Sequence, residues 1–517
     1  MTHRPKLLAS LAALIALVAL ACGSTVPIQE QEAAEAAAEQ GLTDGGLTTA
    51  GGTTGTDFGT GDGSVSSTGG GSGTVTGSGT TAGGSGGSET VASGRVTAGE
   101  NGPGVTSDEI KIGIGYAEDT GEANQALGAA GASQAGWERA HNAMIDYINA
   151  NGGIGGRKVV PVFHRLQTVT SEPIDQQDQE ACAHWTEDDP VFISNGAWRT
   201  ENGIACLEKA GTVVMTSNGL RYKSGSFFEK YPHYVEFDGI DNDDHSTLYA
   251  DSMAKLKFFS NDAKLGILSF DDPEYAGPVQ NTLIPRLDQL GVEVTDVAFV
   301  KRADNTNESG EMVSQINNAV VRFKGEGITH VMFLDQGANL AFFFMQGAER
   351  QQYRPRYGLT TGSGGTTMAD LLRSGGDEDA RAQLHGAVAV GWFPTIDVRS
   401  DDLPAWATPA SQEECYKIMR KGGVNMDSAN ARAQALSVCD SHWTMKATLE
   451  AAGKVLNQDT FIRGLDAIDA TKLDPTSGME LAFSATRHDG NAQAAFLRFF
   501  DKCVCFRYTS DRFQVPD

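Results

Sequence analysis

Polar residues able to bind a small molecule stand at the ends of apolar, strand-like segments of the 517-residue chain. Asp335 and Gln336 directly follow the segment Val331–Leu334. A carboxylate at this place could meet a ligand ammonium, or it could cap the helix that follows. Arg199 follows another such segment, and its guanidinium could hold a carboxylate through two parallel hydrogen bonds or lie on a solvated surface. The chemistry that these residues offer is recognition of a small, charged molecule.

No catalytic motif accompanies these residues. The sequence contains neither an HExxH zinc motif nor a GxxxxGKS/T phosphate-binding loop. The ten histidines do not cluster, and His488 before Asp489-Gly490 favours a structural turn over a general base. The cysteines lack partners at zinc-ligand spacing. We therefore expect a protein that is not an enzyme and that uses no metal or cofactor.

The polar groups need a scaffold, and the sequence predicts strands that alternate with helices in two rounds, one before and one after 234–237. Strands are predicted at 110–116, 159–163, 191–194, 213–216, 265–270, 292–299, 330–334 and 357–360, with more at 482–509. Helices are predicted at 137–148, 174–185, 203–210, 245–259, 279–290, 312–323, 340–350, 413–419 and 429–452. Repeated strand–helix–strand units favour parallel sheets with helices on both faces. The predicted fold class is α/β, with two doubly wound parallel-sheet lobes joined by a hinge.

The chain is expected to divide into five parts. Residues 1–21 form a signal peptide and 22–103 a disordered Gly/Ser/Thr-rich tether, because the tract before Gly94 has few large apolar residues. A Gly-rich coil of this length reaches roughly 50 Å. Residues 104–237 are the first part of lobe one and 238–362 the main part of lobe two. Residues 363–517 are expected to return to lobe one and to supply crossing segments.

The N-terminal sequence predicts that the protein is located outside the cytoplasm. Arg4 and Lys6 precede the apolar run 7–21, which is short for a membrane span. The sequence Ala19-Leu20-Ala21-Cys22 resembles the bacterial lipobox, in which cleavage leaves a cysteine that carries lipid. A plain secretory signal with an incidental cysteine is the alternative. Apart from Cys22 the chain has six cysteines, an even number that suits pairing in an oxidising compartment. We expect a lipoprotein anchored to the cell membrane through Cys22.

The charge balance excludes one class of partner. The chain has 40 Lys and Arg against 66 Asp and Glu, a formal net charge of −26. Binding to nucleic acid needs clustered basic residues that neutralise phosphates, and anionic lipid attracts the same kind of cluster. We therefore expect no nucleic-acid partner and no docking on anionic lipid through protein charge.

Several segments carry a family resemblance. Residues 104–113 and the turn Asn149–Lys158, together with 271–277 and 488–490, resemble the type I periplasmic binding proteins, and most closely their branched-chain amino-acid (Leu/Ile/Val)-binding branch. The resemblance implies the two-lobed fold of that family and capture of a small polar ligand between the lobes, such as an amino acid or amide. It further implies delivery to the permease of an ABC importer. A ligand sensor that signals to a membrane partner through the same scaffold is the alternative.

The resemblance also implies which residues contact the ligand. In lobe one, Thr216 and Ser217 match a hydroxyl-bearing position of the family, or they cap the next segment. Trp198 and Arg199 replace the small residues that are usual in the neighbouring loop, which puts a simple branched-chain amino acid in doubt. In lobe two, Tyr275 matches an aromatic residue that covers the ligand, or it is a packed tyrosine at the rim.

The remaining candidates rest on their positions at strand ends. Asp335 and Gln336 are expected in the cleft, and Ser363, with Thr361, is a weaker candidate. The loop 118–120 could reach the cleft, although surface solvation suits its two acids better.

The family commonly has a disulfide at the position of Cys182 and Cys206, so the resemblance implies this pair. Cys415 and Cys439, on consecutive helical segments, form the second expected pair. Cys503 and Cys505 remain, and they form either a third bridge or two free thiols, because a ring this small is strained.

Overall fold

The structure is a computed structural model. It describes residues 100–516 with gaps at 118–135, 197, 217–222, 261, 338, 366–367, 370–371, 373–379, 469–472 and 485. The signal peptide, Cys22, nearly all of the tether, the loop 118–120 and Ser217 therefore lie outside the described residues. Within the described part, no helix has both the length and the apolar character that a membrane span needs.

Lobe one is built on a five-stranded parallel sheet with the order β2-β1-β3-β4-β5. Its strands are β1 (Glu109–Ala117), β2 (Lys158–Leu166), β3 (Ile193–Gly196), β4 (Val213–Thr216) and β5 (Tyr234–Glu236). Pro161 lies in β2, an edge strand, where its missing N–H removes no ladder hydrogen bond on the open side. The prediction of parallel sheets is confirmed.

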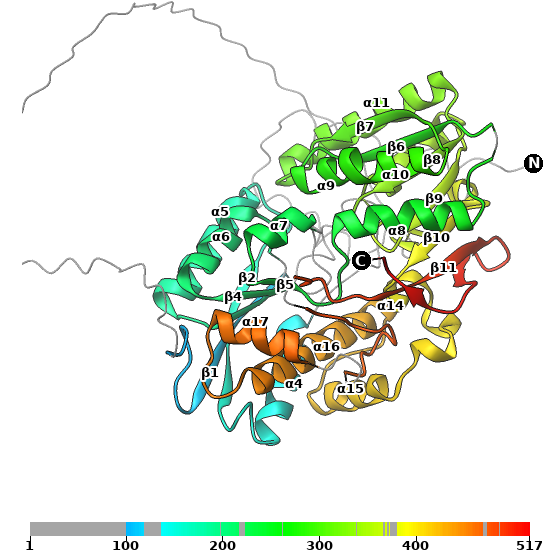
Figure 1. Cartoon of the computed structure of the whole chain (residues 1–517). Helices are drawn as coiled ribbons and strands as arrows, with labels where there is room; N and C mark the ends of the chain where they lie inside the picture. The colour runs from blue at the N-terminus through cyan, green and yellow to red at the C-terminus, as the bar shows by residue number, and fades with distance from the viewer. Residues whose placement is uncertain are drawn as a thin grey trace, which may run out of the picture. The chain divides into compact units, whose positions relative to one another are not determined.

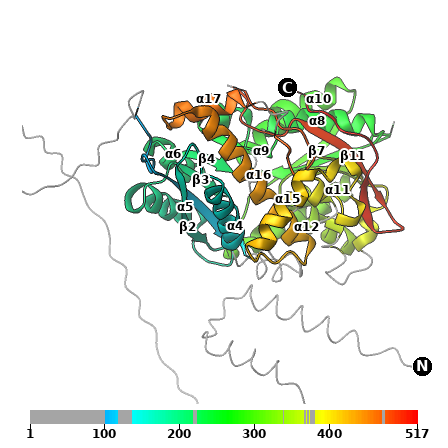
Figure 2. The same ribbon diagram turned by 90° about the horizontal axis from the view of Figure 1, so that it is seen from below.

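The helices of lobe one come from two distant parts of the chain. The early ones are α4 (Trp137–Ala150), α5 (Ile174–Ala183) with a π-helical turn (His184–Asp188), α6 (Glu201–Ala210) and α7 (Gly225–Lys230). The late ones are α15 (Ala410–Lys421), α16 (Ala429–Ala452) and α17 (Gln458–Ala467). Both views show α4 beside α15 and α16 (Figures 1 and 2). Met445 and Leu449 of α16 share a buried core with Ile112 of β1, so the late helices complete this lobe.

Lobe two has a larger, mixed sheet with the order β12-β11-β10-β9-β8-β6-β7, and β13 pairs with β11. The strands are β6 (Leu265–Phe270), β7 (Val294–Val300), β8 (His330–Leu334), β9 (Arg356–Thr360), β10 (Val388–Gly391), β11 (Gln493–Phe500), β12 (Cys505–Tyr508) and β13 (Phe513–Gln514). Strands β6 to β10 pair with one another in parallel, whereas β11 is antiparallel to β10, β12 and β13.

Helices accompany this sheet, and several helical turns are short. They are α8 (Asn242–Lys255), α9 (Pro273–Pro278), a π-helical turn (Val279–Leu283), α10 (Ile284–Gln289), a 3-10 turn (Thr306–Glu308), α11 (Ser309–Glu326), α12 (Asn339–Arg350) and a 3-10 turn (Ala380–Leu384). After β10 the chain continues with α14 (Pro394–Asp397) and the 3-10 turns Ser400–Asp402 and Ala405–Ala407.

The sheets place the return to lobe one later than residue 363. The buried strand β10 still pairs with β9 of lobe two, and β11 to β13 add to the same sheet at the end of the chain. Among the described helices after residue 363, α15 to α17 pack on lobe one. Residues 363–403 and 493–514 therefore belong with lobe two, which differs from the expected division.

Three chain segments cross between the lobes, near residues 237–241, 392–404 and 481–492. The Gly490 N–H donates to Glu236 O at 2.8 Å, and the Asn491 N–H donates to Gly239 O at 2.9 Å. The Asn491 side-chain amide donates to Asp238 O at 3.3 Å and to Trp392 O at 3.0 Å. Asn491 therefore ties all three segments together, as a hinge with more than one strand requires.

The structure contains the three disulfides that the sequence analysis considered. Cys182 joins Cys206 from α5 to α6, and Cys415 joins Cys439 from α15 to α16. Cys503 joins Cys505 in the turn between β11 and β12, which decides between a bridge and two free thiols.

Candidate functional site

A pocket of about 390 Å³ lies between the two lobes. Lobe one contributes Pro173, Asp175, Arg199, Thr200, Glu201, Asn202, Lys223 and Phe227, and lobe two contributes Asp272, Pro273, Glu274, Tyr275 and Asp304. The lobes meet beside it, because the Ser224 N–H and hydroxyl both donate to Glu274 Oε2 at 2.7 Å. The Thr306 hydroxyl also donates to Thr170 O at 2.9 Å. The described residues of both lobes thus line one interlobe pocket, and the lobes contact each other beside it.

Trp198 and Arg199, the two candidates from the loop after β3, both have partners within lobe one. Trp198 is buried in the lobe-one core, where its indole N–H donates to the Ser194 hydroxyl and its ring packs edge-on against Trp185. It does not line the cleft pocket. A tryptophan in place of the family's small residue therefore fills space inside lobe one.

Arg199 lines the pocket, but its guanidinium is paired. Its Nη2 lies 3.1 Å from Asp178 Oδ1, and both side chains are at most 5 % exposed. The other carboxylate oxygen, Oδ2, accepts from the backbone N–H groups of Arg199 and Thr200 and from the Thr200 hydroxyl. The solvated alternative for Arg199 is therefore excluded by burial. Asp178 occupies the guanidinium edge that a ligand carboxylate would otherwise use.

Thr216 ends β4 and is fully buried, with its hydroxyl 3.3 Å from the Tyr234 hydroxyl. Ser217 follows it outside the described residues. Next to Thr216 in the sheet register stands Glu236, which is also fully buried. Neither carboxylate oxygen of Glu236 has a hydrogen-bond partner among the described residues. Burial, and next the neighbouring Asp238, raise the pKa of Glu236 well above its ordinary value.

The lobe-two candidates gather where strands β6, β8 and β9 end. Tyr275 lines the pocket with 1 % of its surface exposed, and its hydroxyl donates to Gln336 Oε1 at 3.3 Å. Arg302, two residues after β7, lies with its guanidinium carbon 3.6 Å from the ring centre of Phe270 and 5.0 Å from that of Tyr275. Tyr275 thus connects the wall of the pocket to a buried group of polar side chains in lobe two.

Three polar atoms of this group are buried without a hydrogen-bond partner among the described residues: Arg302 Nη2, Asp335 Oδ1 and Ser363 Oγ. The other oxygen of Asp335 accepts from the Ala341 N–H at 3.4 Å in the first turn of α12, so this carboxylate also caps a helix. Burial raises the pKa of Asp335 to about 7, although the nearby Ser363 hydroxyl and Arg302 oppose the rise. Arg302 Nη2 is therefore an unused donor in a buried place, and the neighbouring Asp335 and Ser363 can interact with each other or with a ligand.

Sequence reasoning had missed Arg302 and Glu236. Both stand at the carboxyl ends of parallel strands, where ligands bind in doubly wound sheets. Their position at a strand end was the sequence feature that could have marked each as a candidate binding residue. Glu236 ends a three-residue strand, and Arg302 follows Lys301 in what reads as a solvated basic pair, so neither pattern indicated burial.

The buried carboxyl of Asp335 leads to a pH-dependent prediction. A folded pKa of about 7 against an ordinary 3.8 means that the folded chain binds this proton more tightly. The stability that comes from protonation is complete below about pH 4 and is lost as the pH rises through 7. Asp335→Asn mimics the protonated form, so its stability relative to the wild type should increase by about 2–3 kcal/mol between pH 5 and pH 8. Urea unfolding at both pH values measures this, and an unchanged difference would contradict it.

Comparison with known proteins gives a result for the fold alone. No protein-family model and no curated protein matches the sequence. Among solved structures, the periplasmic binding protein type 1 from Bordetella pertussis Tohama I has a TM-score of 0.53 at 15 % identity, covering 78 % of this chain and 100 % of that one. The chain has the type 1 periplasmic binding protein fold.

Two further structures with this fold carry ligands. An ABC transporter substrate-binding protein from Desulfitobacterium hafniense in complex with Leu has a TM-score of 0.51 at 12 % identity, and covers 78 % of this chain and 100 % of that one. An ABC transporter solute-binding protein from R. palustris in complex with 4-hydroxybenzoate has a TM-score of 0.56 at 14 % identity, covering 79 % and 98 %.

Proposed function

We propose that this protein captures a small polar ligand that bears a carboxylate, such as an amino acid, between its lobes and delivers it to an ABC importer outside the cytoplasm. The observation that carries the proposal is the buried set of unpartnered atoms on Arg302, Asp335 and Ser363. Leaving a buried polar atom unpaired costs about 1–3 kcal/mol. A ligand that pairs all three recovers this free energy when it binds.

The chemistry of the three groups selects the ligand. Arg302 Nε already donates to Asp272 Oδ2 at 2.8 Å, and its unpartnered Nη2 is the donor that could suit a ligand carboxylate oxygen. Asp335 and Ser363 suit an ammonium or a hydroxyl. A zwitterion satisfies both needs at once. Leucine and 4-hydroxybenzoate, which occupy two proteins of this fold, each combine a carboxylate with a hydrogen-bond donor.

Closure of the lobes supplies the signal for delivery. Tyr275 lies between the pocket and the buried polar group, so entry of a ligand requires Tyr275 and the lobes to move apart. A membrane permease can distinguish the closed, loaded form from the open one by its shape. In this proposal the lipid on Cys22 and the tether 22–103 hold the folded part close to that permease.

The proposal is tested by calorimetric titration of the full chain with amino acids, amides and aromatic carboxylates. For the ligand that binds, Arg302→Met should weaken binding by 10-fold or more, because it removes the buried donor. Lys301→Met is the matched control, since Lys301 is the adjacent exposed cation and pairs with Glu308 at the surface. The Lys301→Met variant should bind the same ligand with the affinity of the wild type.

Three results would separate the alternatives. Absence of saturable binding across the panel, or equal loss in the Arg302 and Lys301 variants, would contradict the proposal. Binding without any effect of gene deletion on cellular uptake of the same ligand would favour the ligand sensor over the importer component.

A further inference from the structure

A second pocket, of about 300 Å³, lies apart from the interlobe cleft, between α15, α16 and the segment that leads to the third crossing. Its lining residues are Ala410, Ser411, Glu414, Asp440, Trp443, Thr444, Leu473, Asp474, Pro475 and Leu481. None of them lines the cleft pocket. The volume is at the lower end of the range for small-molecule sites.

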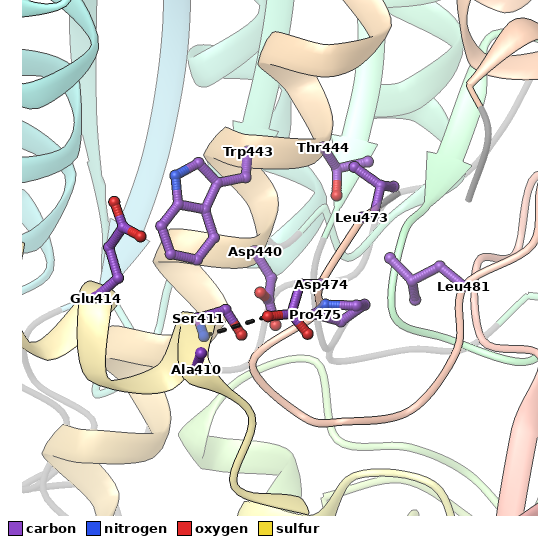
Figure 3. Close-up of a pocket in the computed structure, with 10 residues that line it drawn as sticks. All are labelled: Ala410, Ser411, Glu414, Asp440, Trp443, Thr444, Leu473, Asp474, Pro475 and Leu481. Atoms are coloured by element: carbon purple, nitrogen blue, oxygen red, sulfur yellow. Dashed lines mark hydrogen bonds between the residues drawn. The ribbon is translucent and has the colours of Figure 1, made fainter. Parts of the chain in front are cut away.

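The lining combines three carboxyl groups with an indole and apolar side chains, and its described residues include no lysine, arginine or histidine. Figure 3 shows Glu414 beside Trp443, and the carboxyl groups of Asp440 and Asp474 near Ser411, with Leu473 and Leu481 farther along the wall. Carboxylates and an aromatic face both attract a cation. The apolar residues suit a cation that has a hydrocarbon body.

A separate observation indicates a missing partner. Ser411 is only 9 % exposed, and its hydroxyl has no hydrogen-bond partner among the described residues, although its N–H donates to Asp474 Oδ2 at 3.3 Å. Asp440 accepts from the Thr476 N–H and hydroxyl and is also buried. Burial raises the pKa of Asp440 to about 7, and the charges of Asp238 and Asp474 add to the rise. A positive ligand would relieve this crowding of negative charge.

We propose that this pocket binds a small organic ammonium ion with a short aliphatic body. The ammonium group lies among Glu414, Asp474 and the face of Trp443, and it can donate to the Ser411 hydroxyl. The aliphatic part contacts Leu473, Pro475 and Leu481. This site is independent of the ligand in the interlobe cleft.

The test is calorimetric titration of the full chain with n-butylammonium chloride, against sodium chloride of equal ionic strength and against 1-butanol. Saturable binding of the ammonium, and not of the alcohol or sodium, is expected. The double variant Glu414→Gln/Asp474→Asn should weaken it by 10-fold or more, and because both residues are exposed the change should leave the fold intact. Glu413→Gln, the adjacent exposed acid outside the pocket, should bind like the wild type.

Two more variants define what would overturn the proposal. Arg302→Met should leave butylammonium binding unchanged, and a loss there would assign the heat to the cleft. Lys472 precedes Leu473 and lies outside the described residues. Binding that is found only in Lys472→Met would mean that the chain's own ammonium fills the pocket. Absence of saturable butylammonium binding in both the wild type and Lys472→Met would also refute the site.

Discussion

Replacing Arg199 by methionine should lower the free energy of unfolding by about 3–5 kcal/mol. Arg199 and Asp178 form a pair in which both side chains are at most 5 % exposed. Methionine keeps much of the apolar volume of arginine but removes the positive charge. The Asp178 carboxylate would then be buried without its counter-charge, and an uncompensated buried charge is the costly part of breaking such a pair.

A second substitution separates this cause from a simple loss of packing. In Arg199→Met/Asp178→Asn the buried negative charge is also removed. The asparagine oxygen can still accept from the backbone N–H groups at positions 199 and 200, as Asp178 Oδ2 does in the wild type. We therefore expect the double variant to recover about half of the lost stability. Urea unfolding of both variants at pH 7, followed by far-ultraviolet circular dichroism, measures the difference. A double variant as unstable as the single one would show that packing, and not charge, is lost.

The same pair illustrates why the site was only partly predictable. Asp178 and Arg199 are 21 residues apart, on α5 and after β3, and nothing in either segment indicates that they meet. From the sequence alone, a lone arginine after a strand is as consistent with binding a ligand carboxylate as with pairing to a carboxylate of the protein. Which carboxylate an arginine pairs with depends on how the helices pack, and the sequence pattern does not contain that information.

The strands were predicted well because buried parallel strands are continuous apolar runs. Strands β6 and β8 have the predicted bounds, 265–270 and 330–334. Helix starts were less accurate. Helix α8 begins at Asn242, three residues before the predicted start, because the polar Asp241 caps it. The helix predicted at 279–290 begins at Pro273, since the chain passes Pro278 through a π-helical turn instead of ending there.

For the site itself, position was predictable and role was not. Residues Tyr275, Asp335, Gln336 and Ser363 do gather where the strands of lobe two end, as the alternation of strands and helices implies. For Asp335, one oxygen realises the helix-cap alternative, and the other oxygen has no hydrogen-bond partner among the described residues. Whether these residues contact a ligand remains a prediction that the binding experiment decides.

The hinge gives the second large effect. Gly490→Ala should lower the free energy of unfolding by about 3 kcal/mol or more. A Cβ on Gly490 would lie 1.9 Å from Phe237 O and 2.6 Å from Phe237 C, both backbone atoms of the first crossing segment. Relief by a backbone shift would disturb the hydrogen bonds from Gly490 to Glu236 and from Asn491 to Gly239. Two crossing segments would therefore have to separate.

Gly325→Ala is the matched control, because the same added methyl group meets nothing within 4 Å on α11. Alanine is the better helix former, so this variant should gain about 0.5–1 kcal/mol. Thermal and urea unfolding of both variants under identical conditions measure the contrast. If Gly490→Ala is as stable as the wild type, the crossing segments can move apart at little cost, and the close contact at Phe237 does not constrain the hinge. A loss confined to Gly490→Ala would show that the close contact of Gly490 with Phe237 O is needed for stability.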